Sequence, residues 1–475
     1  MKIINSIRFV GLRYSTLFIN SARGFYLASI LGPKSYGIYA LVILAYQQLS
    51  VLGFGLREGI TLKLSGISKK DKIFTDTLSN ILSFTFIISL ILIISSFALY
   101  YFRAELGAIN EAMYYSSIVF QIASVTINCE ILANTQRILG KVLRVGQTEF
   151  SYSILCLLSI FFVNQLGLGL EYLFYFILAI NFCVMSFYFS LVSKLFKPSI
   201  KKNILKPLLQ SSFPLLVLNT LLLLMQTLGQ WFVGSYSNSI EIGIYSFGAS
   251  LAIVAGNGIS SIAWAYFSEV MGVIKNSTDL KKISNYLIKI RKFIEILFYI
   301  TASISGLAIH IFLEIFFPNY LGADQIFIPL MFSILFQNVI FADTALLMSK
   351  GKIKSLIITS SIFIIILISF CFGVFNTNIL TNAGLSLINS IALFIMLINI
   401  SVSLVILLLS YRYLKTKLYN NLIPFFRLII FSISFLTLNR LGILEIFSIA
   451  TILITIIIFY KEITSSINNR SWPVK

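Results

Sequence analysis

The first long apolar stretch, residues 9–31, contains polar and charged side chains at positions where a membrane helix usually has none. Their spacing is i, i+3, i+7 and i+10, which places them within a sector of about 80° on a helix. The four residues are Arg13, Thr16, Asn20 and Arg23. Charge inside a bilayer is tolerated where it faces water or a partner, so we expect this stripe to face a protein interior or an aqueous cavity. The two guanidinium groups stand about 15 Å apart along the axis, an arrangement that suits the passage of an anion.

The composition indicates what surrounds this helix. Of 475 residues, 58% are hydrophobic and 11% charged, against about 25% charged in an ordinary soluble domain. The chain is therefore expected to be an all-α polytopic membrane protein of about 14 transmembrane helices. The apolar runs that predict these spans are 9–31, 36–61, 76–102, 113–133, 150–168, 171–193, 213–235, 242–267, 293–316, 326–348, 355–375, 383–409, 421–438 and 443–460.

The distribution of positive charge predicts the orientation of the spans. Of the 36 lysines and arginines, 29 fall in alternate connections, whereas the remaining connections contain only Lys34, Arg103 and Arg440. Because cytoplasmic loops carry the excess of basic residues, both termini are expected in the cytoplasm. The net charge of +19 then follows from topology, so we expect no nucleic-acid partner. The four cysteines lie in apolar runs without metal-ligand spacing, so we expect packing roles and neither a metal nor a cofactor.

Two short echoes indicate an internal duplication. YGIYA from Tyr36 reappears as IGIYS from Ile242, an offset of 206 that also places Arg13 over Asn219 and Asn20 over Gln226. A looser echo relates ANTQRILGK, from Ala133, to a later MSKGKIK segment. Six spans separate the copies, so the halves share their orientation and should enclose a cavity near the membrane midplane. We expect an N-terminal six-helix lobe (1–206), a C-terminal six-helix lobe (207–410), and an accessory helix pair with a cytoplasmic tail (411–475).

Other polar residues extend the candidate substrate site. Arg57 lies near the cytoplasmic end of the second span, and snorkelling to the surface is an open alternative for it, for Arg13 and for the deeper Arg23. The seventh span has a neutral polar face at i, i+7 and i+11 spacing, formed by Asn219, Gln226 and Gln230.

Carboxylates within apolar runs could bind a coupling ion or neutralise an arginine. The candidates are Glu130 and Asp343, near the cytoplasmic ends of two spans. We expect Glu295 to contact interfacial water at a helix end, and the single histidine, His310, to be a packing residue. The connection 268–292 is either an amphipathic segment at the membrane surface or a solvated basic loop.

The chain contains no Gly-rich phosphate loop, HExxH motif or nucleophile elbow, so we do not expect an enzyme. Three stretches carry a resemblance to a family: LGPKSYGIYALVILAYQQLSVLGFG from Leu31, IGIYSFGASLAIVAGNGISSIAWAYFSEV from Ile242, and ALLMSKGKIK from Ala345. They resemble polysaccharide-unit flippases of the O-antigen (Wzx) type, which belong to the multidrug/oligosaccharidyl-lipid/polysaccharide (MOP) exporter superfamily.

The resemblance implies a MATE-like fold of two six-helix lobes with two further helices, and a central cavity. It also implies transfer of an undecaprenyl-diphosphate-linked oligosaccharide across the bacterial inner membrane, among membrane lipids and with a polysaccharide polymerase and chain-length proteins as further partners. Related lipid-linked precursor flippases have cationic cavities, and Arg13, Arg23 and Arg57 occupy the spans and depths that this pattern implies.

Two alternatives remain from the residues themselves. A multidrug exporter of the same superfamily would need acidic residues for cationic drugs, whereas the first half is basic. A membrane polysaccharide polymerase usually has a sizeable outside loop for its acceptor, and the outside connections here are short.

Overall fold

The computed structural model describes residues 3–64, 71–102, 110–276, 279–376, 387–414 and 419–455, and its regular elements in these ranges are helices. The all-α fold predicted from composition is confirmed. The first elements are α1 (Ile3–Leu49), η1 (Ser50–Gly53), α2 (Leu56–Leu64), α3 (Lys72–Phe102), α4 (Asn110–Ile138), α5 (Val142–Gln165), α6 (Leu170–Ser190) and η4 (Ser193–Leu195). They are followed by α7 (Lys202–Tyr236), α8 (Ser239–Asn276), α9 (Leu280–Phe316), η5 (Pro318–Tyr320), α10 (Ala323–Val339), α11 (Phe341–Ser349), α12 (Ile353–Asn376), α13 (Leu387–Leu414) and α14 (Tyr419–Arg440).

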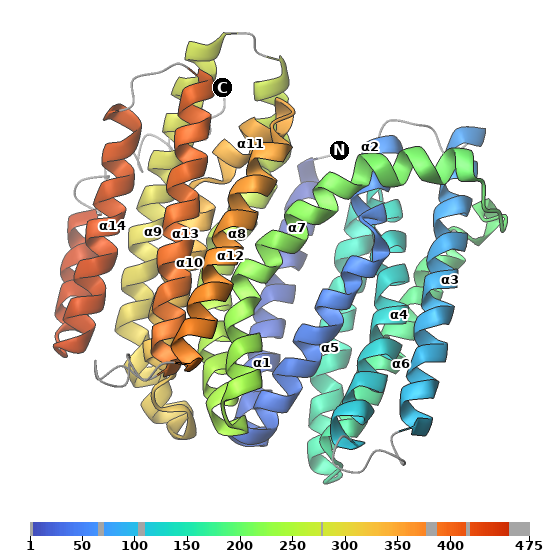
Figure 1. Ribbon diagram of the computed structural model, residues 1–475, viewed down its shortest axis with the longest axis horizontal. Helices are drawn as coiled ribbons and strands as arrows, with labels where there is room; N and C mark the ends of the chain where they lie inside the picture. The colour runs from blue at the N-terminus through green and yellow to red at the C-terminus, as the bar shows by residue number, and fades with distance from the viewer. Residues whose placement is uncertain are drawn as a thin grey trace. The chain divides into compact units, whose positions relative to one another are not determined.

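Eleven of the described helices are long and apolar enough to cross a membrane. The bent pair α10 and α11, which meet at 43°, brings the number of candidate spans to twelve if the pair is one span. The first of the eleven, Gly11–Gly53, contains 43 residues and would extend about 65 Å if straight, twice the ~30 Å of a hydrocarbon core. It is broken at Gly32, whose φ of 64° and ψ of 172° are not helical and suit glycine, and Pro33 follows. Figure 1 shows α1 reversing its direction there, so its two arms account for the first two expected spans.

The later expected spans also have helical counterparts. Helices α3 to α9 each cover one, α10 and α11 together cover the next, and α12, α13 and α14 cover three more. A shorter apolar helix, Leu444–Thr455, lies where the last span is expected.

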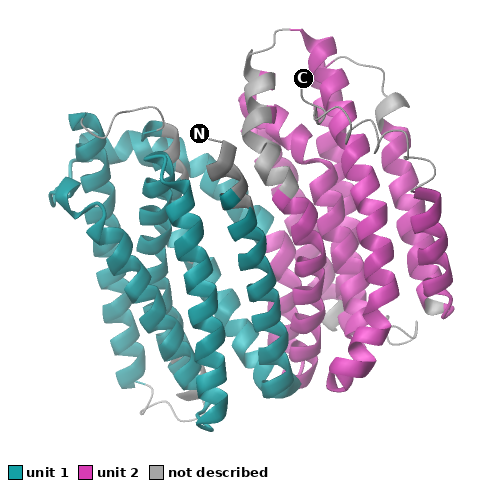
Figure 2. Ribbon diagram, turned by 180° about the vertical axis from the view of Figure 1, so that it is seen from behind, with its two compact units in different colours: residues 1–223 teal, residues 224–475 magenta. Residues whose placement is uncertain are grey.

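The chain forms two compact units, residues 1–223 and residues 224–475, coloured separately in Figure 2. In the first unit, α3 packs on α4, α1 on α5, and α4 on α6. Its buried core includes Leu78, Leu82 and Leu132. A polar contact crosses this core, where Thr85 of α3 donates to the Oδ1 atom of Asn128 (2.9 Å). Such contacts join helices through partners that the bilayer cannot supply.

The second unit is organised around α10, which packs on α8, α9 and α13, while α14 packs on α9. Aromatic side chains fill the space between α9, α10 and α14, with Phe298, Phe332 and Phe435 fully buried. The rings of Phe332 and Phe435 meet edge to face at 5.2 Å between centroids, a favoured geometry for aromatic pairs. The accessory helix α14 is therefore part of the core of this unit.

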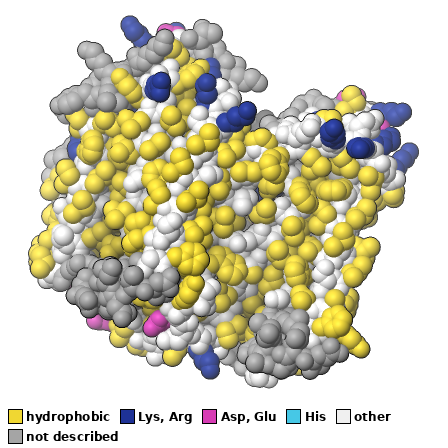
Figure 3. Space-filling model, in the orientation of Figure 1, with side chains coloured by type: hydrophobic (Ala, Val, Ile, Leu, Met, Phe, Trp, Pro, Cys, Tyr) yellow, Lys and Arg dark blue, Asp and Glu magenta, His cyan; other side chains and the backbone are white. Residues whose placement is uncertain are grey.

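The surface of each unit has the pattern of a protein embedded in lipid. Figure 3 shows hydrophobic side chains across the middle of both units, with lysine and arginine gathered toward one end of each. Large exposed apolar residues such as Ile94, Phe97 and Ile365 would face acyl chains there. The chain is a multi-pass membrane protein.

Candidate functional site

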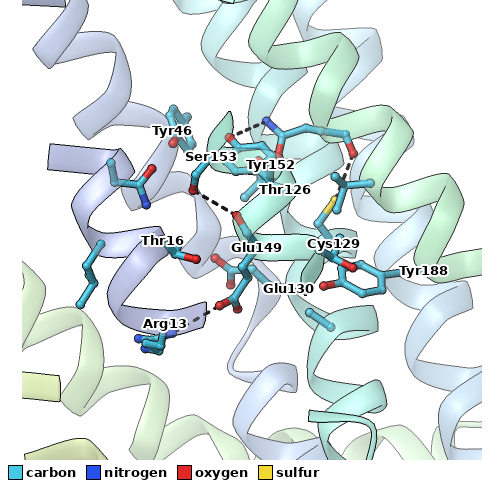
Figure 4. A pocket seen from close by; sticks show the side chains of 16 residues that line it. Arg13, Thr16, Tyr46, Thr126, Cys129, Glu130, Glu149, Tyr152, Ser153 and Tyr188 are labelled. Atoms are coloured by element: carbon cyan, nitrogen blue, oxygen red, sulfur yellow. Dashed lines mark hydrogen bonds and ion pairs between the residues drawn. The ribbon is translucent and has the colours of Figure 1, made fainter. Parts of the chain in front are cut away.

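A cavity of about 360 Å³ lies inside the first unit, among α1, α4, α5 and α6. Twelve of the sixteen residues that line it have polar or charged side chains, although it lies within helices of membrane-spanning length. The lining residues are Arg13, Thr16, Leu17, Asn20, Tyr46, Thr126, Cys129, Glu130, Ala133, Thr148, Glu149, Tyr152, Ser153, Asn181, Val184 and Tyr188. Figure 4 shows Arg13 and Tyr46 at opposite ends of the labelled side chains. The cavity therefore contains three predicted site residues, Arg13, Asn20 and Glu130.

Glu149 of α5 binds two arginines at one end of the cavity. Its Oε2 atom lies 3.4 Å from Nη1 of Arg13, and its Oε1 atom lies 2.7 Å from Nη2 of Arg137. These side chains remain about one-third exposed, at 35% for Arg13 and 31% for Glu149. Arg13 is thus neutralised by an internal carboxylate but still borders open space.

Glu130 of α4 makes the second ion pair at the cavity. Its Oε2 atom lies 3.4 Å from Nη1 of Arg57, which is carried by α2. The backbone carbonyl of Arg57 also accepts a hydrogen bond from Nδ2 of Asn134 (2.6 Å), so α2 and α4 are joined at two points. Arg57 therefore connects to the cavity through Glu130 and does not line it.

Arg23 differs from the other two predicted arginines, because no carboxylate pairs with it among the described residues. It lies near the hydroxyl groups of Tyr39, Tyr46 and Tyr152 and near the sulfur of Cys156. Tyr46 and Tyr152 also line the cavity, so Arg23 stands directly behind that wall. A half-buried cation surrounded by neutral groups is ready to receive an anion.

The neutral residues predicted on the seventh span, now on α7, are not among the residues that line this cavity. Asn219 is exposed and belongs to the first unit, while Gln226 and Gln230 belong to the second. Nε2 of Gln226 donates to Oε1 of Gln337 (2.7 Å), and Nε2 of Gln337 donates to Oδ1 of Asn399 (2.6 Å). Gln226 thus begins a chain of amides that leads into the core of the second unit.

Asp343 also belongs to the second unit, where it forms a buried ion pair with Arg291 of α9. Arg291 lies in the predicted connection 268–292, which is in fact the end of α8 and the start of α9 in its described part. Asp279 caps α9, its Oδ1 atom accepting from the backbone nitrogen of Lys281 (2.9 Å). Ile283 and Leu287 are fully buried. The described segment is therefore an amphipathic helix whose apolar face packs into the protein, and the expectation of a solvated loop is wrong.

Glu295 is 1% exposed and lies 3.2 Å from Nη2 of Arg427. The expectation that it contacts interfacial water is wrong, because α14 packs over this part of α9. His310 lies 3.0 Å from Oδ1 of Asn439 and joins the same two helices at another level.

Sequence reasoning did not select Glu149, Arg137 or Tyr152. The apolar runs 113–133 and 150–168 place Glu149 and Arg137 in a cytoplasmic connection, but α4 continues to Ile138 and α5 begins at Val142. Glu149 thus lies two turns inside a helix. The turn at Gly140, where φ is 76°, is the local signal that marks a short connection between two longer helices. Within the described ranges, no cluster of three or more His, Cys, Asp or Glu residues could hold a metal ion.

Comparisons with solved structures show the fold. The chain resembles an inward-facing multidrug resistance MATE family transporter of the MOP superfamily (16% identity, TM-score 0.65, covering 84% of this chain and 94% of that one). It also resembles the lipid II flippase MurJ in an inward closed conformation (15% identity, TM-score 0.64, covering 98% of this chain and 99% of that one). A MOP superfamily transporter from Pyrococcus furiosus is similar as well (15% identity, TM-score 0.56, covering 87% of this chain and 95% of that one). The MATE-like fold predicted from the resemblance is confirmed.

No curated protein matches the chain by sequence. A family described as "Polysaccharide biosynthesis protein" matches residues 26–320, which is more than half of the chain and includes α2 to α9 with most of the cavity. The chain therefore belongs to the polysaccharide biosynthesis protein family and has the fold of the MOP superfamily.

Proposed function

We propose that this protein is a flippase that moves oligosaccharide units linked to undecaprenyl diphosphate from the cytoplasmic to the outer leaflet of a bacterial inner membrane, by alternating access. The observation that carries the proposal is Arg23, a cation within a membrane span that has no carboxylate partner in the described chain. A charge in that position is unfavourable unless an anion or water compensates it, and the diphosphate of a lipid-linked sugar supplies that anion. The family and the fold shared with a lipid II flippase support the same substrate class.

The proposal assigns different tasks to the arginines. Arg13 and Arg57 are each already neutralised by a carboxylate, so they would guide the diphosphate at the cytoplasmic entrance without binding it inside the cavity. Arg23 lies about 15 Å further along α1 than Arg13 and would hold the headgroup part of the way across. Both termini lie in the cytoplasm in this proposal, and lobes 1–206 and 207–410 move against each other with 411–475 as an accessory segment.

Coupling to an ion belongs to the proposal as well. Glu130 and Asp343 are the candidate carboxylates, and both are paired with arginines. Protonation of either carboxylate would release its arginine, which is a direct way to link an ion gradient to a cationic transport path.

A second candidate function is cation-coupled multidrug export. The observation in its favour is that Glu130 and Glu149 both line the cavity, because acidic residues attract cationic drugs. Each of them already pairs with an arginine, however, so a cation entering there would meet positive charge as well. The flippase proposal accounts for Arg23 and multidrug export does not.

The experiment replaces Arg23 with alanine and with lysine in a strain whose native gene has been deleted. Arg23→Ala should abolish surface polysaccharide while the protein remains in the membrane, and Arg23→Lys should restore part of it, since charge survives but the two-point guanidinium fork does not. Arg144→Ala, an exposed arginine of the same unit, is the matched control and should act as wild type. Normal polysaccharide in the Arg23→Ala strain would refute the proposal.

A further inference from the structure

We propose that the cavity inside the first unit is a subsite for one neutral, hydroxyl-rich sugar ring of the transported unit, and that the diphosphate does not enter it. This inference rests on the proposed function and specifies which chemical group the cavity recognises. Four observations carry it: the surplus of hydrogen-bond acceptors, the paired state of the charges, the tyrosines and the size.

Several groups of the cavity wall are hydrogen-bond acceptors. The hydroxyl groups of Thr16, Thr126 and Ser153 each donate to a carbonyl of their own helix, at 2.8, 2.8 and 3.0 Å. Each of these hydroxyl oxygens therefore keeps lone pairs as an acceptor and has no free proton. The Oδ1 atom of Asn20 is buried without a hydrogen-bond partner, and carboxylate oxygens of Glu130 and Glu149 add further acceptors. A ligand rich in O–H donors would satisfy this wall.

The charges argue against an ion inside the cavity. A phosphate there would lie beside the carboxylates of Glu130 and Glu149, and like charges at close range are costly. A cation would meet the arginines that already neutralise both carboxylates, Arg13, Arg57 and Arg137. The wall thus suits a neutral group. The anion would instead bind Arg23, which is not among the residues that line the cavity.

Tyrosines from three helices give the cavity apolar faces with polar edges. Tyr46 comes from the second arm of α1, Tyr152 from α5 and Tyr188 from α6, and all three line the space, as Figure 4 shows. A tyrosine ring combines an apolar body with a hydroxyl group, which matches the apolar C–H faces and hydroxyl rim of a sugar. Tyr152 also receives a hydrogen bond from Nδ2 of Asn181 at 3.4 Å, which holds its hydroxyl at the cavity.

The volume of the cavity limits the size of the group that it can hold. Pockets for small molecules range over about 300–1,000 Å³, and this cavity, at about 360 Å³, is near the lower bound. It suits a group of monosaccharide size and excludes a complete repeat unit. The remaining sugars of the substrate would stay outside it.

The test is equilibrium binding to the full-length protein in lipid nanodiscs. The probe is the lipid-free oligosaccharide released by mild acid from the lipid-linked pool of the source strain and then radiolabelled. Wild type should bind it, and Asn20→Leu should weaken binding about 2- to 13-fold, the factor for one lost hydrogen bond of about 0.5–1.5 kcal/mol. Tyr152→Phe should weaken it to a similar extent. Asn164→Leu, a matched change at an exposed asparagine of α5, should leave affinity unchanged.

The inference is overturned if the oligosaccharide does not bind, or if Asn164→Leu weakens binding as much as Asn20→Leu. It is also overturned if inorganic pyrophosphate or sodium, titrated in parallel, binds in a way that Asn20→Leu abolishes, because the cavity would then be an ion site. Failure of the flippase proposal is distinguishable: it appears as normal polysaccharide in the Arg23→Ala strain, whatever the nanodisc binding shows.

Discussion

The carboxylate of Asp343 and the guanidinium group of Arg291 form a two-point ion pair inside the second unit. Nε of Arg291 donates to Oδ2 of Asp343 at 2.9 Å, and Nη2 donates to Oδ1. Asp343 is 0% exposed. The pair joins α9 to α11, the helix after the 43° bend, so it holds the bent span against its neighbour.

Removing one partner of this pair should destabilise the protein strongly. Asp343→Ala leaves the Arg291 charge buried without its carboxylate, a change that typically costs about 3–5 kcal/mol. We expect a clear fall in the midpoint of thermal unfolding of the detergent-purified protein.

The double variant Arg291→Met/Asp343→Leu is the control, because it removes both charges and should recover most of the lost stability. If that variant is stable but does not support surface polysaccharide, Asp343 has the coupling role proposed for it. Wild-type stability in Asp343→Ala would contradict the structural role of the pair.

Two glycines of α8 provide a matched test of helix packing in the second unit. A Cβ atom on Gly256 would clash with Cγ2 of Ile334 on α10, whereas a Cβ atom on Gly258 would have no neighbour within 4 Å. Gly256→Ala should therefore lower stability by about 1–3 kcal/mol through overpacking. Gly258→Ala should be neutral or stabilise slightly, since alanine favours a helix. Equal effects in an unfolding assay would contradict the close approach of α8 and α10.

The fold was predictable because membrane helices are specified by local composition. Each apolar run of sufficient length has to form its own backbone hydrogen bonds in lipid, so the expected spans reappear as helices even where α1 joins two of them. The polar stripe on residues 9–31 was predictable for the same reason, and Arg13 and Asn20 do line a cavity. The bilayer, more than the neighbouring residues, therefore determines where the spanning helices lie and that a polar stripe must face away from lipid.

Partner identity was not predictable, because it depends on which helices meet. Arg13 pairs with Glu149, 136 positions away, and Arg57 pairs with Glu130, 73 positions away. Neither spacing has a local signature. The burial of Glu295 likewise depends on α14, which follows it by more than 120 residues. Helix-to-helix packing supplies this information, and periodicity within one helix does not.

The orientation of the chain can be tested with fusions. Alkaline phosphatase fused after Lys34, in the turn of α1, should be active because it would lie outside the cytoplasm, whereas fusion after Gly140 should be inactive. Green fluorescent protein fused to the C-terminus should fluoresce, because the C-terminus lies in the cytoplasm in the proposed topology and this reporter folds poorly outside the cytoplasm. An active fusion after Gly140 would reverse the proposed topology and exclude entry of the substrate from the Arg13 end.

Replacing Glu149 with glutamine should convert one end of the cavity into an anion site. In the native protein this carboxylate occupies donors of both Arg13 and Arg137, and so competes with any phosphate that approaches them. Glu149→Gln keeps the shape but removes the competing charge. Because the groups are about one-third exposed, we discount the interaction to about 1 kcal/mol, which corresponds to a roughly fivefold gain in affinity.

Isothermal titration of the nanodisc-embedded protein with inorganic pyrophosphate measures this gain. The gain should shrink as salt is raised, because partly exposed charges are screened. Asp76→Asn, which removes the partner of Lys201 in the same unit (3.3 Å), is the matched control and should leave pyrophosphate affinity unchanged. An affinity in Glu149→Gln at or below that of wild type would mean that Arg13 and Arg137 cannot reach an anion, and Glu149 would then have a purely structural role.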